Sequence, residues 1–332
     1  MAYLSNAIPP KVVIAFALSA VYPLAIWYSI FTKKSLIRNL ILQYYKIDIP
    51  PVQSSSQPKI IINSIIMISF LIPVISSTVA MAFAQDDPPM KRYYSFHLCL
   101  EDNFFSFLIR FTVMQLIFFC QYSFISVAMV MCGALYCNLS DLLHRFAEGL
   151  RYLHCKSISH RNLVVPMQLH ASLFKMAHKL QNATSVTACL ILCSQILAMF
   201  VILTTYILLD SEQWSIPLAF ESIPGISTVP LTVVGIILCG SRIPSQVENC
   251  NIYLLSLHDQ LTSEPKVDRE SLILVKAMLN KRFPYMSACS LAKFTPKLIV
   301  SIFGSLLTYG LLIVNMKETE SPMGKNSTIV NC

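Results

Sequence analysis

The last apolar stretch of the chain reads SIFGSLLTYGLLIVNM and covers residues 301–316. Thr295 and Pro296 lie just before it and fit the N-cap and the first position of a helix. A helix from about 297 to 316 is long enough to cross a membrane, which takes about 20 mostly apolar residues. Small and polar side chains interrupt this span at regular intervals.

Five of these side chains share one narrow face of the helix. On a helical wheel they lie within about 80° of one another. Close helix packing through small residues explains such a face, and so does a water-facing surface with one apolar constriction. Packing explains a terminal asparagine less well, but the physics alone favours neither interpretation. The five residues are Ser301, Gly304, Thr308, Leu311 and Asn315.

The composition of the whole chain is that of an integral membrane protein. Of its 332 residues, 55% are hydrophobic and 13% are charged, whereas soluble domains have about 25% charged residues. The net charge of +8 does not indicate a nucleic-acid partner, because the basic residues lie between apolar runs rather than on one folded face. Six runs predict an all-α, polytopic transmembrane helical bundle in a single domain, with spans at about 12–31, 60–84, 105–136, 185–209, 217–240 and 297–316.

The distribution of Lys and Arg predicts the orientation. Loops 32–59, 137–184 and 241–295 together hold 18 basic residues, and the connections on the other side hold 5. By the positive-inside rule the three basic loops are cytosolic, which places both termini outside the cell. The glycosylation sequon at Asn326 agrees with an external C-terminal tail.

Two of the cytosolic loops carry amphipathic helices, within 137–184 and 241–295. We expect them to form a packed cytosolic helical layer, because two of the helices run directly into spans. The alternative is that they lie on the membrane surface. The apolar positions at helical spacing include Leu139, Leu143, Phe146, Leu150, Leu173, Met176, Leu180, Val275 and Met278.

Motifs of enzymes and metal sites are absent from the sequence. It contains no glycine-rich phosphate loop, no nucleophile elbow and no zinc-protease motif, so we expect no enzyme and no cofactor. Five histidines share one cytosolic loop, but they are 6 to 10 residues apart, and a helical metal pair needs a spacing of three or four. No metal site is expected.

A ligand pocket is predicted among the outer halves of the spans. Arg110 and Glu221 lie there, and a charge at such a position either faces protein or water or reaches the interface by snorkelling. If both turn inward, they flank an outward-facing cavity with apolar walls, which suits a small molecule. The alternative for the aromatic members of this set is anchoring at the membrane interface. These members are Phe104, Phe107, Tyr206, Trp214 and Phe220.

The end of the last span resembles a family motif. TYGLLIVNM is similar to the motif of the arthropod gustatory receptors, in which Thr and Tyr precede five hydrophobic residues, Gln and Phe. Thr308 and Tyr309 match it, whereas Asn315 replaces Gln and Met316 replaces Phe. Segments 169–192 and 286–307 also resemble the stretches that lead into two spans of that family.

This resemblance implies a taste receptor of the insect chemoreceptor superfamily, which acts as a ligand-gated, non-selective cation channel in the plasma membrane. It implies a homo- or heterotetramer with related subunits, with the last span around a central pore, and as partners a small-molecule tastant, permeant cations and membrane lipid. The family has seven spans, so the chain is expected to lack the first of them. The alternatives are a G-protein-coupled type of receptor or a transporter, but the chain shows neither a DRY-like triplet after its third span nor paired broken helices.

Overall fold

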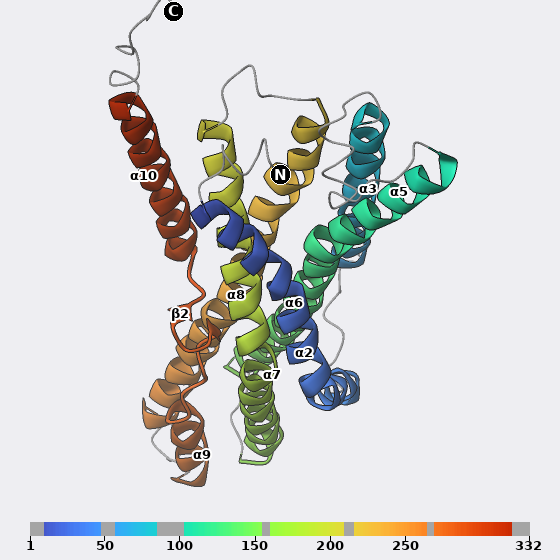
Figure 1. The fold of residues 1–332 in the computed structure, drawn as a ribbon. Coiled ribbons are helices and arrows are strands. Elements are labelled where there is room, and N and C mark those ends of the chain that lie inside the picture. The colour runs from blue at the N-terminus through green and yellow to red at the C-terminus, as the bar shows by residue number, and fades with distance from the viewer. Residues whose placement is uncertain are drawn as a thin grey trace, which may run out of the picture.

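The computed structural model describes residues 10–47, 57–84, 103–154, 160–208, 216–263 and 269–320. Figure 1 shows long helices that cross one another in a bundle, with the last helix at its edge. The helices are α2 (Pro10–Lys46), α3 (Gln57–Ala84), α5 (Phe104–Phe118), α6 (Phe124–His154), α7 (His160–Leu208), α8 (Ile216–Ser263), α9 (Arg269–Leu279) and α10 (Pro296–Glu320). A π-helical turn, η1 (Phe119–Ser123), joins α5 to α6, and the short strands β1 (Ser287–Ala288) and β2 (Ala292–Lys293) form an antiparallel pair.

Five helical stretches of the described residues are long and apolar enough to cross a membrane, so the predicted polytopic helical bundle is confirmed. They overlap the second to sixth predicted spans. The first, 12–31, falls on α2, whose side chains are described from Val21 onward. The helix predicted to begin at Pro296 does begin there, and the amide of Leu298 donates to the Thr295 carbonyl over 2.9 Å.

Two helices, α7 and α8, are far longer than a membrane is thick. α7 has 49 residues and α8 has 48, so each extends over about 70 Å, whereas a bilayer core measures about 30 Å. Their halves outside the predicted spans pack with the end of α6 and with α9 at one end of the molecule (Figure 1). Leu139, Leu143, Leu173 and Val275 are buried in this layer, so these amphipathic segments pack against one another.

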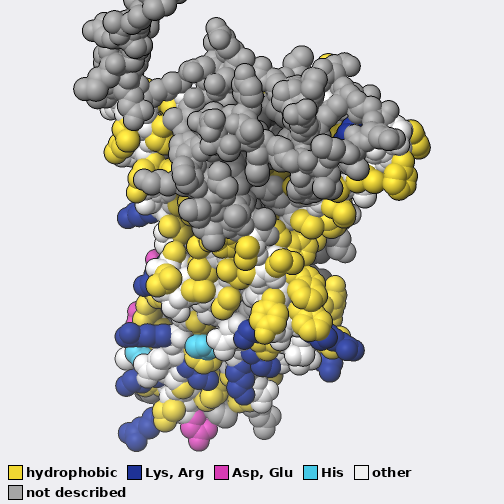
Figure 2. All heavy atoms as spheres, viewed as in Figure 1, with side chains coloured by type: hydrophobic (Ala, Val, Ile, Leu, Met, Phe, Trp, Pro, Cys, Tyr) yellow, Lys and Arg dark blue, Asp and Glu magenta, His cyan; other side chains and the backbone are white. Residues whose placement is uncertain are grey.

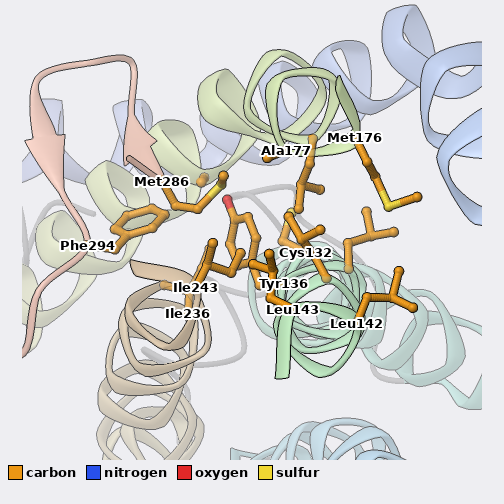
Figure 3. Close-up of a cluster of buried hydrophobic side chains, with 14 of the residues drawn as sticks. Cys132, Tyr136, Leu142, Leu143, Met176, Ala177, Ile236, Ile243, Met286 and Phe294 are labelled. Atoms are coloured by element: carbon orange, nitrogen blue, oxygen red, sulfur yellow. The ribbon is translucent and has the colours of Figure 1, made fainter. Parts of the chain in front are cut away.

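The core lies where α6 passes between α7 and α8. Figure 3 shows Tyr136 at its centre, with Cys132 and Leu143 on the same helix and Ile236 and Ile243 on α8. Met286 and Phe294, which flank the strand pair, close this cluster. The core therefore joins three long rods to the segment that leads into α10.

The segment before α10 differs from the helix expected within 241–295. Helix α9 ends at Leu279, and residues 287–293 form the hairpin of β1 and β2. Pro284 disfavours a continued helix, and an extended chain covers more distance per residue between the far end of α9 and the start of α10. Cys289 and Ser290 make the turn with φ of 48° and 61°. These are left-handed values without a glycine, which is why the sequence lacks the usual turn signal.

Candidate functional site

Helix α10 has one face against its own bundle. Ile302 is buried, Leu306 and Ile313 are half-buried, and Gly310 is buried against α7. A Cβ atom at Gly310 would lie 3.1 Å from Cδ2 of Leu203, so this small residue lets the two helices approach closely.

The five residues of the predicted stripe lie on the other face. Ser301, Gly304, Thr308, Leu311 and Asn315 are all exposed in the single chain. Ile302, Leu306 and Ile313 lie about 160° to 180° away from Gly304 around the helix. The structure thus turns the stripe away from the bundle of its own chain.

Two hydroxyl groups on the exposed side of α10 form hydrogen bonds within the helix. The Thr308 hydroxyl donates to the Gly304 carbonyl and the Ser305 hydroxyl donates to the Ser301 carbonyl, each over 2.9 Å. A hydroxyl has two acceptor lone pairs besides its proton. Both oxygens can therefore accept a hydrogen bond from water, or face a cation, while their protons stay satisfied.

Most of α10 is left uncovered by the rest of the chain. Only 6% of the apolar membrane-length stretch of α10 is buried, compared with 44% of the corresponding stretch of α7 and 50% of that of α8. The Tyr309 ring meets Phe200 of α7 edge-on, with ring centroids 6.1 Å apart, but more than half of that side chain is still exposed. Lipid or further protein must cover this surface, because a helix in a membrane is always surrounded by one or the other.

The base of α10 is held firmly by the hairpin. The Gln181 side chain of α7 accepts a hydrogen bond from the Ser287 amide (3.1 Å) and donates to the Ser287 hydroxyl (2.7 Å) and carbonyl (3.2 Å). Phe294 packs edge-on against Tyr136, with centroids 5.9 Å apart, and fits over Gly240 of α8. Sequence reasoning missed these contacts, and the residues that could have signalled them are Gly240, which is buried on α8, and Gln181, which is half-buried on α7.

The C-terminal part of α3 and the adjoining part of α5 carry a second, smaller hydrophobic cluster. It consists of Ala80, Met81, Ala84, Met114 and Phe118, and it is separate from the main core. Arg110 belongs to the same buried stripe of α5 as Met114 and Phe118, and only 7% of its surface is exposed. This part of the bundle therefore combines a buried guanidinium on α5 with an apolar cluster.

The structure brings part of the predicted ligand set to this cluster. Phe107 and Phe220 pack against it, and Phe220 also stacks on Phe83 with centroids 6.0 Å apart. Tyr206 shares a 2.9 Å hydrogen bond with Ser222 on α8. Phe104 is 79% exposed and does not join the cluster. Trp214, Asn326 and the Glu221 side chain lie outside the described residues.

The fold is similar to that of a solved receptor. Over 94% of this chain and 81% of the other, it matches the insect olfactory receptor OR5 from Machilis hrabei, with a TM-score of 0.54 and 11% sequence identity. No protein-family profile and no curated protein matches the sequence. The chain is thus a polytopic helical membrane protein whose fold is similar to that of this insect olfactory receptor.

Proposed function

We propose that the chain is a chemosensory receptor of the gustatory type, which opens a non-selective cation pathway when a small-molecule tastant binds. The observation that carries the proposal is the outward polar face of α10, on a helix that its own bundle leaves almost uncovered. Similarity of fold to an olfactory receptor supports it. A protein of this kind catalyses no reaction and needs no cofactor.

The pathway requires several copies of α10. One helix cannot enclose a pore, so the faces that hold Ser301, Gly304, Thr308, Leu311 and Asn315 would surround a common axis. Four subunits, identical or related, are implied by the resemblance of the motif. In this arrangement Leu311 forms the narrow apolar ring, which blocks ions by dewetting while the channel is closed. Asn315 follows about one turn further out.

The proposed tastant site is the outer cluster of α3 and α5. Arg110 would supply its polar contact, and Phe107 and Phe220 its aromatic walls. Apolar walls with a few polar groups are typical of small-molecule sites. Tastant binding would reach the pore through α8, which packs against α3, α7 and α10.

Thiol accessibility tests the pore assignment. Single cysteines at positions 308, 311 and 315 should react with a membrane-impermeant thiol reagent in cells, whereas cysteines at 306 and 313 should not, because those positions face the bundle. Equal reactivity at all five positions would show that the stripe is a packing surface.

Two further measurements test the class and the assembly. Tastant-evoked whole-cell current should persist when G proteins are blocked, because the pore is part of the receptor itself. Its loss under blockade would favour a G-protein-coupled receptor. The protein in mild detergent should have the mass of four subunits, and a monomeric mass would contradict the channel.

A further inference from the structure

Helix α2 presents a continuous exposed stripe opposite its packed face. Ile26, Ile37 and Leu40 are buried on the side that packs against α6 and α7. Side chains on the other side follow one another at intervals of three or four residues, so they share one face of the helix. These are Leu24, Trp27, Phe31, Lys34, Arg38 and Leu42, and all are exposed.

The chemistry of this stripe changes along the helix. From Leu24 to Phe31 it is apolar and aromatic, and from Lys34 to Arg38 it is basic. Figure 2 shows hydrophobic side chains across the middle of the molecule, which give way to dark-blue Lys and Arg side chains below. A change of this kind is typical of the boundary between the hydrocarbon core and the headgroup region, where aromatic residues are also enriched.

Direct contacts hold Trp27, Phe31 and Lys34 in place at this boundary. The rings of Trp27 and Phe31 stack with centroids 5.3 Å apart and planes 18° apart. Nζ of Lys34 lies 4.1 Å from the centroid of the Phe31 ring, in a cation–π contact. The ammonium group is therefore held at the edge of the aromatic patch.

The basic part of the stripe lines a hollow of about 440 Å³. Its polar groups are the ammonium of Lys34, the hydroxyl of Ser35, the guanidinium of Arg38 and the amide of Asn39, and Leu42 supplies an apolar wall. All four polar side chains can donate hydrogen bonds, and a guanidinium binds two oxygens of a phosphate at once. In the part of the chain that the structure describes, no carboxylate forms an ion pair with Lys34 or Arg38.

We propose that this stripe is a binding site for one anionic glycerophospholipid of the leaflet that meets the basic end of α2. The phosphate group lies in the hollow between Lys34 and Arg38, and an acyl chain runs along Trp27 and Leu24. Cations beside an apolar strip fit a ligand with a negative head and a hydrocarbon tail. A zwitterionic lipid fits less well, because its headgroup has no net negative charge to offset Lys34, Arg38 and the nearby Lys33.

Tryptophan fluorescence provides a direct test, since the chain has only two tryptophans, Trp27 and Trp214. The variant Trp214→Phe leaves Trp27 as the single reporter. The full chain is reconstituted in vesicles with a small fraction of lipid brominated on its acyl chains, because bromine quenches tryptophan only on contact. Brominated phosphatidylserine should quench Trp27 at a mole fraction at least threefold lower than brominated phosphatidylcholine does.

Matched variants show whether the hollow causes this preference. Lys34→Gln/Arg38→Gln should abolish the threefold difference and leave quenching by phosphatidylcholine unchanged. Arg269→Gln/Lys276→Gln removes the same charge from another helix, α9, and should keep the difference. Equal quenching by the two lipids, or equal loss in both double variants, would overturn the proposal.

A final arm distinguishes a lipid headgroup from a soluble anion. Millimolar inorganic phosphate at constant ionic strength should leave the quenching by brominated phosphatidylserine unchanged. If phosphate removes the preference for phosphatidylserine, the hollow binds free phosphate groups and the lipid proposal is wrong.

Discussion

The hydroxyl of Tyr136 donates a 2.9 Å hydrogen bond to the hydroxyl of Thr184, 48 positions further along the chain. Thr184 donates in turn to the Leu180 carbonyl over 2.8 Å. Tyr136 is fully buried, and its ring contacts Phe294 just before α10. This one side chain therefore connects α6, α7 and the base of the candidate pore helix.

Tyr136→Phe should lower the stability of the protein by about 1 kcal/mol, because it removes a buried hydrogen bond and keeps the ring. Thermal unfolding of the detergent-solubilised protein should show a lower midpoint. Tyr285→Phe, at an exposed ring, is the control and should leave the midpoint unchanged. Equal effects of the two substitutions would mean that the Tyr136–Thr184 bond contributes nothing.

Gly240→Ala should destabilise the base of α10. The new Cβ would lie 2.4 Å from Cδ2 and 3.1 Å from Cβ of Phe294, so the whole ring has to shift. Overpacking of this kind costs about 1–3 kcal/mol. Gly149→Ala is the matched control, because a Cβ there meets nothing within 4 Å and alanine favours a helix. If the unfolding midpoint of Gly240→Ala equals that of the wild type, the close contact between Gly240 and Phe294 is contradicted.

Substitutions on the outward face of α10 should change conduction. Leu311→Ser places a polar group in the proposed apolar ring and should raise the current without tastant, because water and ions then stay in the constriction. Asn315→Asp should raise the permeability to divalent relative to monovalent cations through a ring of negative charge, and Asn315→Gln should be mild. Whole-cell recordings with ion substitution measure both effects. The control is Leu307→Ser, which makes the same change at another exposed position of α10. It shows whether a general loss of packing is enough to change the current.

The predicted orientation can be tested with epitope tags. A tag after Cys332 should bind antibody on intact cells, because the C-terminal tail is expected outside. A tag at Ser263, the last residue of α8, should bind only after the cells are permeabilised. The reverse pattern would contradict the orientation derived from the basic loops.

Acidification should destabilise the helical layer at His170. Its ring lies between those of Phe146 and Phe283, with centroids 5.8 Å and 5.2 Å away, and Nδ1 has no hydrogen-bond partner among the described residues. Burial, followed by the charge of Lys281, lowers the pKa of His170 from 6.5 to about 4. The folded state thus binds this proton more weakly than the unfolded state, so stability is complete above pH 6.5 and falls as the pH drops toward 4.

At pH 5 this loss is on the order of 2 kcal/mol relative to pH 7. The unfolding midpoint of the wild type should therefore decrease between pH 7 and pH 5, and the decrease should be smaller for His170→Leu. His144→Leu, on α6, is the comparison. If His170→Leu and the wild type show the same pH dependence, the buried histidine is not its source.

The amino-acid sequence by itself determined the features that depend on neighbouring residues along the chain. The apolar runs predicted the helices, since only a helix satisfies its own backbone within a membrane. Pro296 marked the start of α10, and the helical period placed Ser301, Gly304, Thr308, Leu311 and Asn315 on one face. Arg110 stood out because a charge in a span needs a partner or water.

Only the tertiary structure decided which way these faces turn. Nothing in the helical period tells whether the stripe of α10 meets its own bundle, and contacts with residues about 100 positions away decide that it does not. Gln181 meets Ser287 at a separation of 106 residues, and their hydrogen bonds hold a hairpin whose turn has no glycine. Contacts of this kind depend on how the long helices cross. Periodicity and composition within a single segment do not encode that crossing.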